Sequence, residues 1–507
     1  MKTEPLPKIS GVAWLSLSAI TAIGIFLRFR VCGESLWLDE LHTAWTAMVG
    51  DAQLADRARL GNNGSLYFYC VRVFTQIFGQ SEWTLRLPSL IAGGLLIPGT
   101  FFVCRVWRCA TVASLLAAAL VAVDRNMFFF SCEARPYGCV QLLGLVHIFL
   151  FVRLLTGRKR TWTWLIWVLC GMGMFHLHCT SALIIAAEVI AYMGLRWFAY
   201  PIEIQPRYLL IGFVVIALGI LPGLGLLQTI AERRENWSHF VKMTRNPLKM
   251  LTMYPLGVYL LAPLVLGFAL PFFQNALGRV GALPEQDEEP ELRETPYLMP
   301  LIVCGCCLVV PIVTAWTLTE ADIVRLFFRR YLIASSVVLA PLTALLICSL
   351  VRRGRSVVYV SGFVFAIAVI DASFRSNFTS RVHEDWRDAV EVLNREPVDQ
   401  PVILYSGLIE TDAWHATTNS EYRSYCEFPL RGIYAIDSER EVTILPRSLA
   451  VPPIRLPDET SHAWLLVRSS SPSEVKEGVL QTLGEQWSIE TQQQCGRLLL
   501  CLLQRVE

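Results

Sequence analysis

Residues 11–27 read GVAWLSLSAITAIGIFL, an apolar run long enough to form a membrane-spanning helix. It is followed closely by ESLWLDELHTAW, residues 34–45, which brings Asp39, Glu40 and His42 together. Carboxylates near lipid are costly unless they are solvated, paired or used in function. The two acids therefore indicate either the charged start of a helix, where they favour the macrodipole, or a functional site.

The overall composition is typical of a protein with many membrane spans. The chain has 507 residues, of which 54% are hydrophobic and 17% charged, and its mean hydropathy is +0.46. Soluble domains carry about 25% charged residues. A formal net charge of +2 gives no indication of a nucleic-acid partner. Most of the fifteen cysteines lie in apolar runs, where cysteine acts as a small hydrophobic residue.

Apolar runs recur along the first three quarters of the chain and predict about eleven spans. The stretch 65–79 is also apolar but short, and it fits either an interfacial helix or a further span. The predicted spans are 11–27, 84–104, 109–123, 137–155, 161–178, 181–199, 208–229, 254–273, 297–317, 331–350 and 356–372.

The short turns between spans predict the orientation in the membrane. The turns at 105–108, 157–160 and 352–355 are basic and contain no acid. With eleven spans they lie on the same side as the N-terminus, which the positive-inside rule makes cytoplasmic.

The last quarter of the chain predicts a separate domain. Residues 376–507 contain no spanning run, and they alternate helical with β-like segments, which indicates an α/β domain of about 130 residues. The division is thus a membrane domain, 1–375, with a first outside loop at 28–83, and an extracytoplasmic domain, 376–507. The helical segments are 384–395 and 472–486, and the β-like segments are 401–407, 463–469 and 496–505.

The acids of the opening stretch lie on a predicted helix, 39–50. Leu41, Ala44, Trp45 and Met48 form one apolar stripe, as in a helix lying in the membrane interface. Adjacent residues on a helix point about 100° apart, so Asp39 and its neighbour are expected to have different roles.

Two further charged motifs fall on the same predicted side. SCEARPYG, 131–138, precedes a span, and FFRRYL, 327–332, lies at the mouth of another. Each motif alone also fits snorkelling arginines in an aromatic belt. Together with the opening acids they suit transfer from a lipid-phosphate-linked sugar. Arginines can bind the phosphate, and a carboxylate can take the proton of an attacking hydroxyl.

In this order the motifs resemble the GT-C glycosyltransferases over roughly residues 11–350. They are SLWLDELHTAW, the stretch 65–94 that begins SLYFYC, CEARPYG and FFRRYL. The resemblance is strongest to the protein O-mannosyltransferase-like branch, which includes the bacterial aminoarabinose transferase acting on lipid A. It implies a polytopic enzyme of a cell envelope, expected in the bacterial inner membrane, that uses a polyprenyl-phosphate sugar donor on the periplasmic or luminal face.

The resemblance also implies roles for individual residues. Asp39 matches the family's catalytic carboxylate, and Glu40 completes the catalytic pair. The remaining matched or nearby residues are expected to bind substrate: Arg28, Arg30, His42, Glu133, Arg135, Tyr137, His178, Arg330 and Tyr331. The segment NNGSLYF, 62–68, departs from the family's His/Lys-Pro-Pro-Leu-Tyr pattern, so the shape of the donor or acceptor pocket is expected to differ.

Several alternatives stay open at the level of sequence. His176, His178 and Cys179 fit either a divalent metal site or hydrogen-bonded histidines at a helix end. A flippase or transporter of lipid-linked sugars, or a scaffold presenting 376–507, would share the many spans. Transporters, however, place ionisable residues near the bilayer midplane, whereas here they recur at one surface. A transferase using a larger lipid-linked donor is the alternative among enzymes.

Overall fold

The chain forms two compact units, which are described separately. The computed structural model describes residues 8–157, 161–232, 255–269, 297–351, 354–374, 384–448, 456–457 and 459–506. The helical unit comprises Met1–Arg30, Asn62–Tyr67 and Pro88–Thr379, and the mixed unit comprises Val31–Gly61, Phe68–Leu87 and Ser380–Glu507. The basic turns predicted at 157–160 and 352–355 lie largely outside the described residues.

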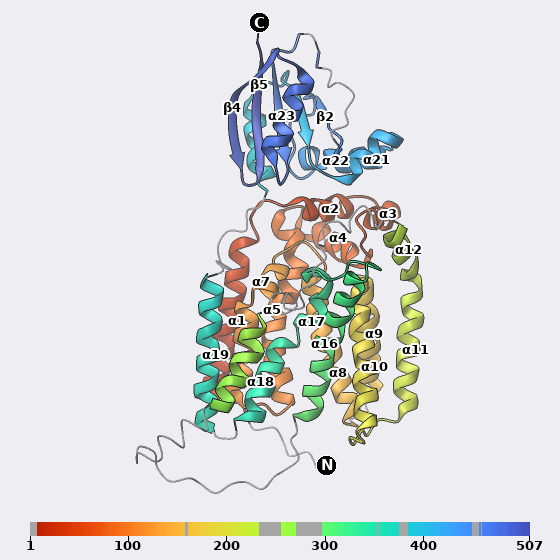
Figure 1. The fold of residues 1–507 in the computed structure, drawn as a ribbon, viewed down its shortest axis with the longest axis vertical. Helices are drawn as coiled ribbons and strands as arrows, with labels where there is room; N and C mark the ends of the chain where they lie inside the picture. The colour runs from red at the N-terminus through yellow and green to blue at the C-terminus, as the bar shows by residue number, and fades with distance from the viewer. Residues whose placement is uncertain are drawn as a thin grey trace. The chain divides into compact units, whose positions relative to one another are not determined.

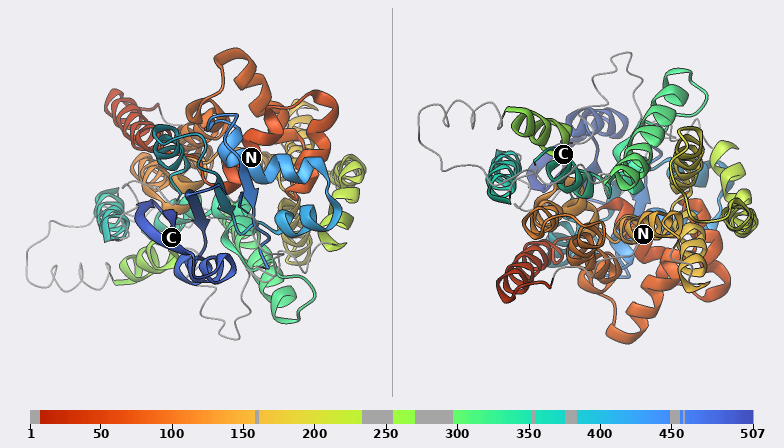
Figure 2. Two further views of the ribbon diagram at one scale, coloured as in Figure 1. Left: turned by 90° about the horizontal axis from the view of Figure 1, so that it is seen from above. Right: turned by 90° about the horizontal axis from the view of Figure 1, so that it is seen from below.

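The helical unit is built from long apolar helices that run side by side (Figures 1 and 2). Seven described helices are long and apolar enough to cross a membrane, and two bent pairs raise this number to nine. With two shorter apolar helices, Thr161–Leu177 and Gly257–Ala269, they account for all eleven predicted segments. The main helices are α1 (Gly11–Val31), α5 (Glu82–Val106), α6 (Thr111–Val123), α7 (Arg125–Ser131), α8 (Tyr137–Leu155), α9 (Thr161–Leu177), α10 (Ala182–Trp197), α11 (Pro206–Ile220), α12 (Leu224–Glu232), α16 (Leu298–Glu320), α17 (Ile333–Ser336), α18 (Leu339–Leu350) and α19 (Gly354–Phe374).

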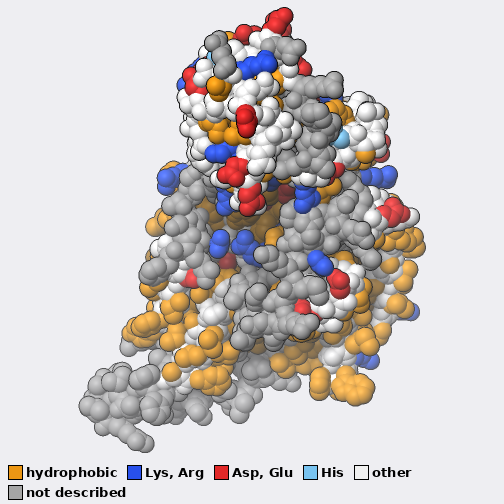
Figure 3. All heavy atoms as spheres, turned by 45° about the horizontal axis from the view of Figure 1, so that its top comes forward, with side chains coloured by type: hydrophobic (Ala, Val, Ile, Leu, Met, Phe, Trp, Pro, Cys, Tyr) orange, Lys and Arg blue, Asp and Glu red, His pale blue; other side chains and the backbone are white. Residues whose placement is uncertain are grey.

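The outer surface of the helical unit is apolar. Side chains such as Leu15, Phe26, Leu210 and Phe363 are more than half exposed, and Figure 3 shows hydrophobic side chains gathered over these helices. An apolar surface of this extent suits lipid rather than water. The chain is an integral membrane protein.

Two of the spans are broken. Helices α6 and α7 meet at 56°, and the segment Arg329–Ser336 meets α18 at 42°. A break frees backbone groups that need other partners in a membrane, so irregular backbone occurs there where it is buried or lines a site. The motifs CEARPYG and FFRRYL both lie beside these breaks.

The mixed unit joins the first loop of the chain to its C-terminal domain. The loop contributes α2 (Leu38–Ala47), α3 (Asp51–Leu60), most of α4 (Leu66–Phe78) and the first turns of α5. The C-terminal part contributes the helices α20 (Trp386–Arg395), α21 (Ile409–Thr417), α22 (Ser420–Arg431) and α23 (Pro472–Leu483), together with the sheet.

The sheet has five strands in the order β2-β1-β3-β5-β4. Strand β1 pairs in parallel with β2 and β3, whereas β5 pairs antiparallel with β3 and β4. The predicted β-like segments 401–407, 463–469 and 496–505 overlap β1, β3 and β5, so the predicted α/β fold is confirmed. The strands are β1 (Val402–Tyr405), β2 (Val442–Ile444), β3 (His462–Arg468), β4 (Trp487–Cys495) and β5 (Leu498–Arg505).

Helices cover both faces of this sheet. Val475 and Val479 of α23 pack with Ile403 and Leu465 in one buried core. On the other face of the sheet, α20 packs against β4 and β5, and α22 packs against β2. Strands covered on both faces are apolar throughout rather than alternating, as the run Val402–Tyr405 shows.

Candidate active site

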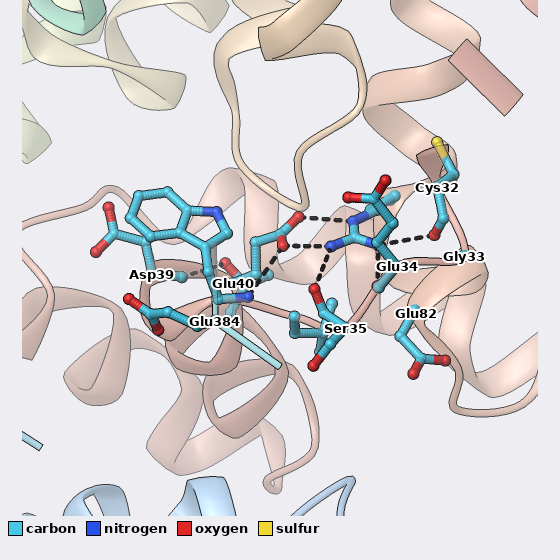
Figure 4. A network of polar contacts seen from close by, with 12 residues as sticks. Cys32, Gly33, Glu34, Ser35, Asp39, Glu40, Glu82 and Glu384 are labelled. Carbon is cyan, nitrogen blue, oxygen red and sulfur yellow. Dashed lines mark hydrogen bonds and ion pairs between the residues drawn. The ribbon is translucent and has the colours of Figure 1, made fainter. Parts of the chain in front are cut away.

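Asp39 and Glu40 lie in the first turn of α2, in the mixed unit. Their side chains point in different directions, as the helical geometry predicts (Figure 4). Asp39 is partly exposed, whereas Glu40 is fully buried. The two adjacent acids therefore have different environments, and only Asp39 keeps access to solvent.

Glu40 forms a buried, two-pronged ion pair with Arg86 of α5. Arg86 donates from Nε to Oε1 at 2.8 Å and from Nη2 to Oε2 at 2.5 Å. The two side chains are 0% and 3% exposed. Removing one member of such a pair leaves a buried charge and costs about 3–5 kcal/mol. Because its carboxylate is occupied by Arg86, Glu40 is better suited to a structural role than to contact with a substrate.

Helix α2 is buried on nearly all sides. Leu41, Ala44 and Trp45 of the predicted apolar stripe are buried, but so are His42 and Thr46, which lie outside that stripe. The expectation of a helix lying in the membrane interface is thus corrected, because neighbouring protein covers both faces.

The neighbours of His42 explain its burial. Its ring contacts those of Trp45, Phe68 and Tyr425, and its Nε2 lies 3.1 Å from the carbonyl oxygen of Arg57. The expected substrate-binding role of His42 receives no support from this arrangement, which packs the imidazole inside the mixed unit.

A second group of predicted residues comes together in the helical unit. We call Arg135, Tyr137, His178, Arg330 and Tyr331 the arginine cluster. The His178 ring lies between two tyrosines, with centroids 5.7 Å from Tyr137 and 6.0 Å from Tyr331. Each tyrosine also has a guanidinium beside it, Arg135 at 6.0 Å and Arg330 at 5.6 Å from the respective ring centroid. Two motifs almost 200 residues apart thus meet around one histidine.

Buried hydrogen bonds hold the CEARPYG loop. Ser89 donates to the carbonyl oxygen of Arg135 at 2.7 Å, and the hydroxyl of Tyr67 lies 2.9 Å from that serine. Glu133 is buried, and its carbonyl accepts from the Arg135 amide at 2.8 Å. Arg135 Nη2 also donates to Asn63 at 3.4 Å. The guanidinium of Arg135 is therefore carried on a rigid backbone.

His178 lies in the break between α9 and the short helix Cys179–Ser181. Its Nδ1 is 2.7 Å from the hydroxyl of Thr180, which donates to the carbonyl oxygen of Tyr331 at 2.6 Å. The two guanidinium groups of the cluster are of the kind that binds phosphate through paired hydrogen bonds.

Arg28 and Arg30 have contrasting environments. Arg28 is fully buried and donates to the carbonyl oxygens of Val121 and Ala122 at 2.9 and 3.0 Å, and to Ser131 at 2.8 Å. Arg28 thus satisfies carbonyl groups freed at the α6–α7 break. Arg30 is exposed at the end of α1.

The NNG segment forms a tight turn instead of the proline-rich segment of the family. Asn62 has a φ of +58°, a left-handed conformation that asparagine adopts more easily than most residues. A Cβ on Gly64 would lie 2.1 Å from the carbonyl oxygen of His176, so only glycine fits there. The turn also places the side chain of Asn63 beside Arg135.

The two histidines considered as metal ligands make separate hydrogen bonds. His176 Nε2 lies 2.9 Å from the Gly219 carbonyl oxygen, and His178 lies against Thr180. Within the described part of the chain, no group of three or more His, Cys, Asp or Glu residues is placed to hold a metal ion.

Arg86 is the main residue that the sequence analysis did not single out. It belongs to the stretch 65–94 that carries the resemblance. A charged residue inside the predicted span 84–104 is the signal that could have drawn attention to it, because such residues need a partner.

Comparisons with known proteins agree with the resemblance to glycosyltransferases. Residues 63–222 match the family model described as dolichyl-phosphate-mannose-protein mannosyltransferase. No curated protein sequence matches the chain.

Solved structures of similar overall arrangement include ArnT from Cupriavidus metallidurans bound to undecaprenyl phosphate, with 11% identity and a TM-score of 0.47 over 97% of this chain and 98% of that one. Another is the oligosaccharyltransferase of Archaeoglobus fulgidus, with 13% identity and a TM-score of 0.44 over 85% and 64% of the two chains. The family match over residues 63–222, which include the CEARPYG motif and His178, confirms the resemblance of this membrane protein to the GT-C glycosyltransferases.

Proposed function

We propose that the protein is a membrane glycosyltransferase that moves a sugar from a polyprenyl-phosphate donor to a hydroxyl group of a lipid, glycan or protein. One observation carries this proposal: Arg135 and Arg330 come together around His178 and two tyrosines in the helical unit. The matched family is itself named for a lipid-phosphate-linked sugar donor.

The arginine cluster is suited to the phosphate of the donor. Guanidinium groups bind phosphate through paired hydrogen bonds, and lysine is not equivalent in this role. Tyr137 is also the first residue of α8, whose N-terminus favours a negative charge. As the sugar–phosphate bond breaks, the leaving phosphate gains charge that Arg135 and Arg330 would stabilise.

Asp39 is the proposed general base. The acceptor hydroxyl gives its proton to the Asp39 carboxylate, and its oxygen forms a bond to the anomeric carbon. The bond from that carbon to the phosphate oxygen breaks, and the polyprenyl phosphate leaves with the electron pair. A single displacement of this kind inverts the anomeric configuration.

Glu40 and Arg28 take supporting roles in this proposal. Glu40 forms the buried ion pair with Arg86, and Arg28 donates hydrogen bonds to carbonyl groups before the α6–α7 break. Of the residues first considered as substrate ligands, Arg135, Tyr137, His178, Arg330 and Tyr331 remain in the proposed site, with Glu133 as a support of their loop and Arg30 as a peripheral cation.

The proposed location is the bacterial inner membrane, with residues 376–507 on the extracytoplasmic side. The basic short turns predicted between spans support this orientation.

The test compares cells with and without the gene by mass spectrometry of glycolipids and glycoproteins. We expect one glycosylated product to be present only in cells that carry the gene. Its identity gives the acceptor and the sugar, which are then used to assay the purified protein. Asp39→Asn preserves the side chain's shape and removes the base, so transfer should fall about 10²-fold or more while expression is unchanged. Glu40→Gln should instead lower thermal stability, since it breaks the buried pair with Arg86.

The proposal fails if no glycosylated product depends on the gene, or if purified Asp39→Asn protein transfers sugar at the wild-type rate. Redistribution of a lipid-linked sugar between leaflets, without loss of any glycosylated product, would indicate a flippase instead.

A further inference from the structure

The segment Cys32–Trp37, which leads into α2, has neither helical nor strand structure, so its backbone polar groups need partners from elsewhere. Arg86 supplies one set. Its guanidinium donates to the carbonyl oxygens of Cys32 at 2.8 Å, Glu34 at 2.6 Å and Ser35 at 3.2 Å. These bonds hold one side of the segment, as the dashed lines in Figure 4 show.

The C-terminal part of the mixed unit supplies the other partners. The Tyr434 hydroxyl accepts from the amide of Leu36 at 2.8 Å, and Glu384 Oε2 accepts from the amide of Leu38 at 3.0 Å. Arg387 donates to the carbonyl oxygen of Gly33 at 2.8 Å. Leu38 is the first residue of α2 and directly precedes Asp39.

These side chains are themselves held in place. Glu384 is 6% exposed, and it accepts from Arg468 Nε at 2.6 Å and from Trp386 Nε1 at 3.1 Å. The Tyr434 hydroxyl donates to Glu82 Oε1 at 3.0 Å, and Arg387 forms an ion pair with the same carboxylate. Burial raises the pKa of Tyr434 to about 12, so its hydroxyl keeps its proton at neutral pH.

Further contacts tie α2 and α3 to α22. Trp45 Nε1 donates to the Ser424 hydroxyl at 3.0 Å, and Arg57 pairs with Glu421 at 2.9 Å. The first loop and residues 384–506 thus form one folded unit through side chains that meet at both ends of α2.

We infer that the C-terminal domain is a positioning domain, in which Tyr434 and Glu384 hold the backbone before α2 and thereby set the orientation of Asp39. This inference rests on the proposed function of Asp39. A displacement of about 1 Å in a catalytic group can cost about 10²-fold in rate. A few hydrogen bonds that fix the backbone before Asp39 are therefore enough to affect the rate of sugar transfer.

The experiment uses full-length protein in nanodiscs and the variant Tyr434→Phe, which removes only the hydroxyl. Hydrogen exchange of peptides covering residues 32–40 should become faster by about tenfold, the scale of one lost hydrogen bond. The turnover number should fall about tenfold while KM for the donor is unchanged, as expected when only transition-state alignment suffers. In an Asp39→Asn background, Tyr434→Phe should cause no further loss.

The matched control is Tyr405→Phe. Tyr405 belongs to the same domain, and its hydroxyl donates to the carbonyl oxygen of Arg447 at 3.1 Å. This variant should leave exchange at 32–40 and the turnover number unchanged. Glu384→Gln, a second probe at the Leu38 amide, should act like Tyr434→Phe, with the melting temperature measured for all variants.

The inference is overturned if active wild-type protein and Tyr434→Phe show equal exchange at 32–40 and equal turnover. A rise in KM for the acceptor at unchanged turnover would also overturn it, because the domain would then bind acceptor. If wild-type protein transfers no sugar but Tyr434→Phe still speeds exchange, the proposed function fails and the structural support for α2 stands.

Discussion

At the scale of single residues, the neighbourhood of a side chain decides what the same chemical group can do. Asp39 and Glu40 are adjacent carboxylates, yet one is partly exposed and the other is buried against Arg86. A buried charged pair is weak evidence for stability by itself, but breaking it is costly. The partly exposed Asp39 is therefore the acid that we propose as the general base.

At the scale of secondary-structure elements, the broken span α6–α7 is the feature that shapes the arginine cluster's surroundings. Asp124 caps α7 by accepting from the Met127 amide at 2.8 Å, and Tyr259 donates to the same carboxylate at 2.9 Å. Arg28 satisfies the carbonyl oxygens of Val121 and Ala122 before the break. A kink in a membrane helix persists only when such groups find partners.

Replacement of Arg28 is the prediction for this element. Arg28→Met keeps much of the volume and leaves buried carbonyl groups unpaired, at about 1–3 kcal/mol each. We expect a clearly lower melting temperature in detergent. Arg30→Met, two residues along on the exposed end of α1, should change stability by no more than about 0.5 kcal/mol. Equal melting temperatures for the two variants would show that Arg28 does not brace the break.

At the scale of the whole molecule, orientation in the membrane is the property to test. Among the described residues, seven to nine helices are long and apolar enough to span a membrane, and two shorter apolar helices occupy the remaining predicted positions. If all eleven cross the membrane, the two ends of the chain are predicted to lie on opposite sides. The basic turn at 105–108 follows the second span and is predicted to be cytoplasmic.

Reporter fusions measure this orientation. Alkaline phosphatase fused after Glu507 should be active, and green fluorescent protein at the same point should be dark, because both report an extracytoplasmic end. Fusions after residue 157 should give the opposite pair of results. Fluorescence at Glu507 with no phosphatase activity would reverse the proposed topology.

The sequence by itself determined the features that depend on local composition. Runs of about 20 apolar residues predict spans because a helix of that length crosses the hydrocarbon core. A helix also pairs its own backbone N–H and C=O groups, which have no water to bind in lipid. The covered strands β1, β3 and β5 were visible as short apolar runs. The motifs around Asp39, Arg135 and Arg330 stood out because charges beside apolar runs are rare.

Only the tertiary structure decided which polar groups pair. Glu40 and Arg86 are 46 residues apart, and Leu36 and Tyr434 are 398 apart. Arg28, expected near substrate, instead satisfies carbonyls about 94 residues away. Sequence pattern reports whether a side chain prefers water or lipid, but a buried polar group must also find a partner, and that partner is brought within 3 Å only by the fold.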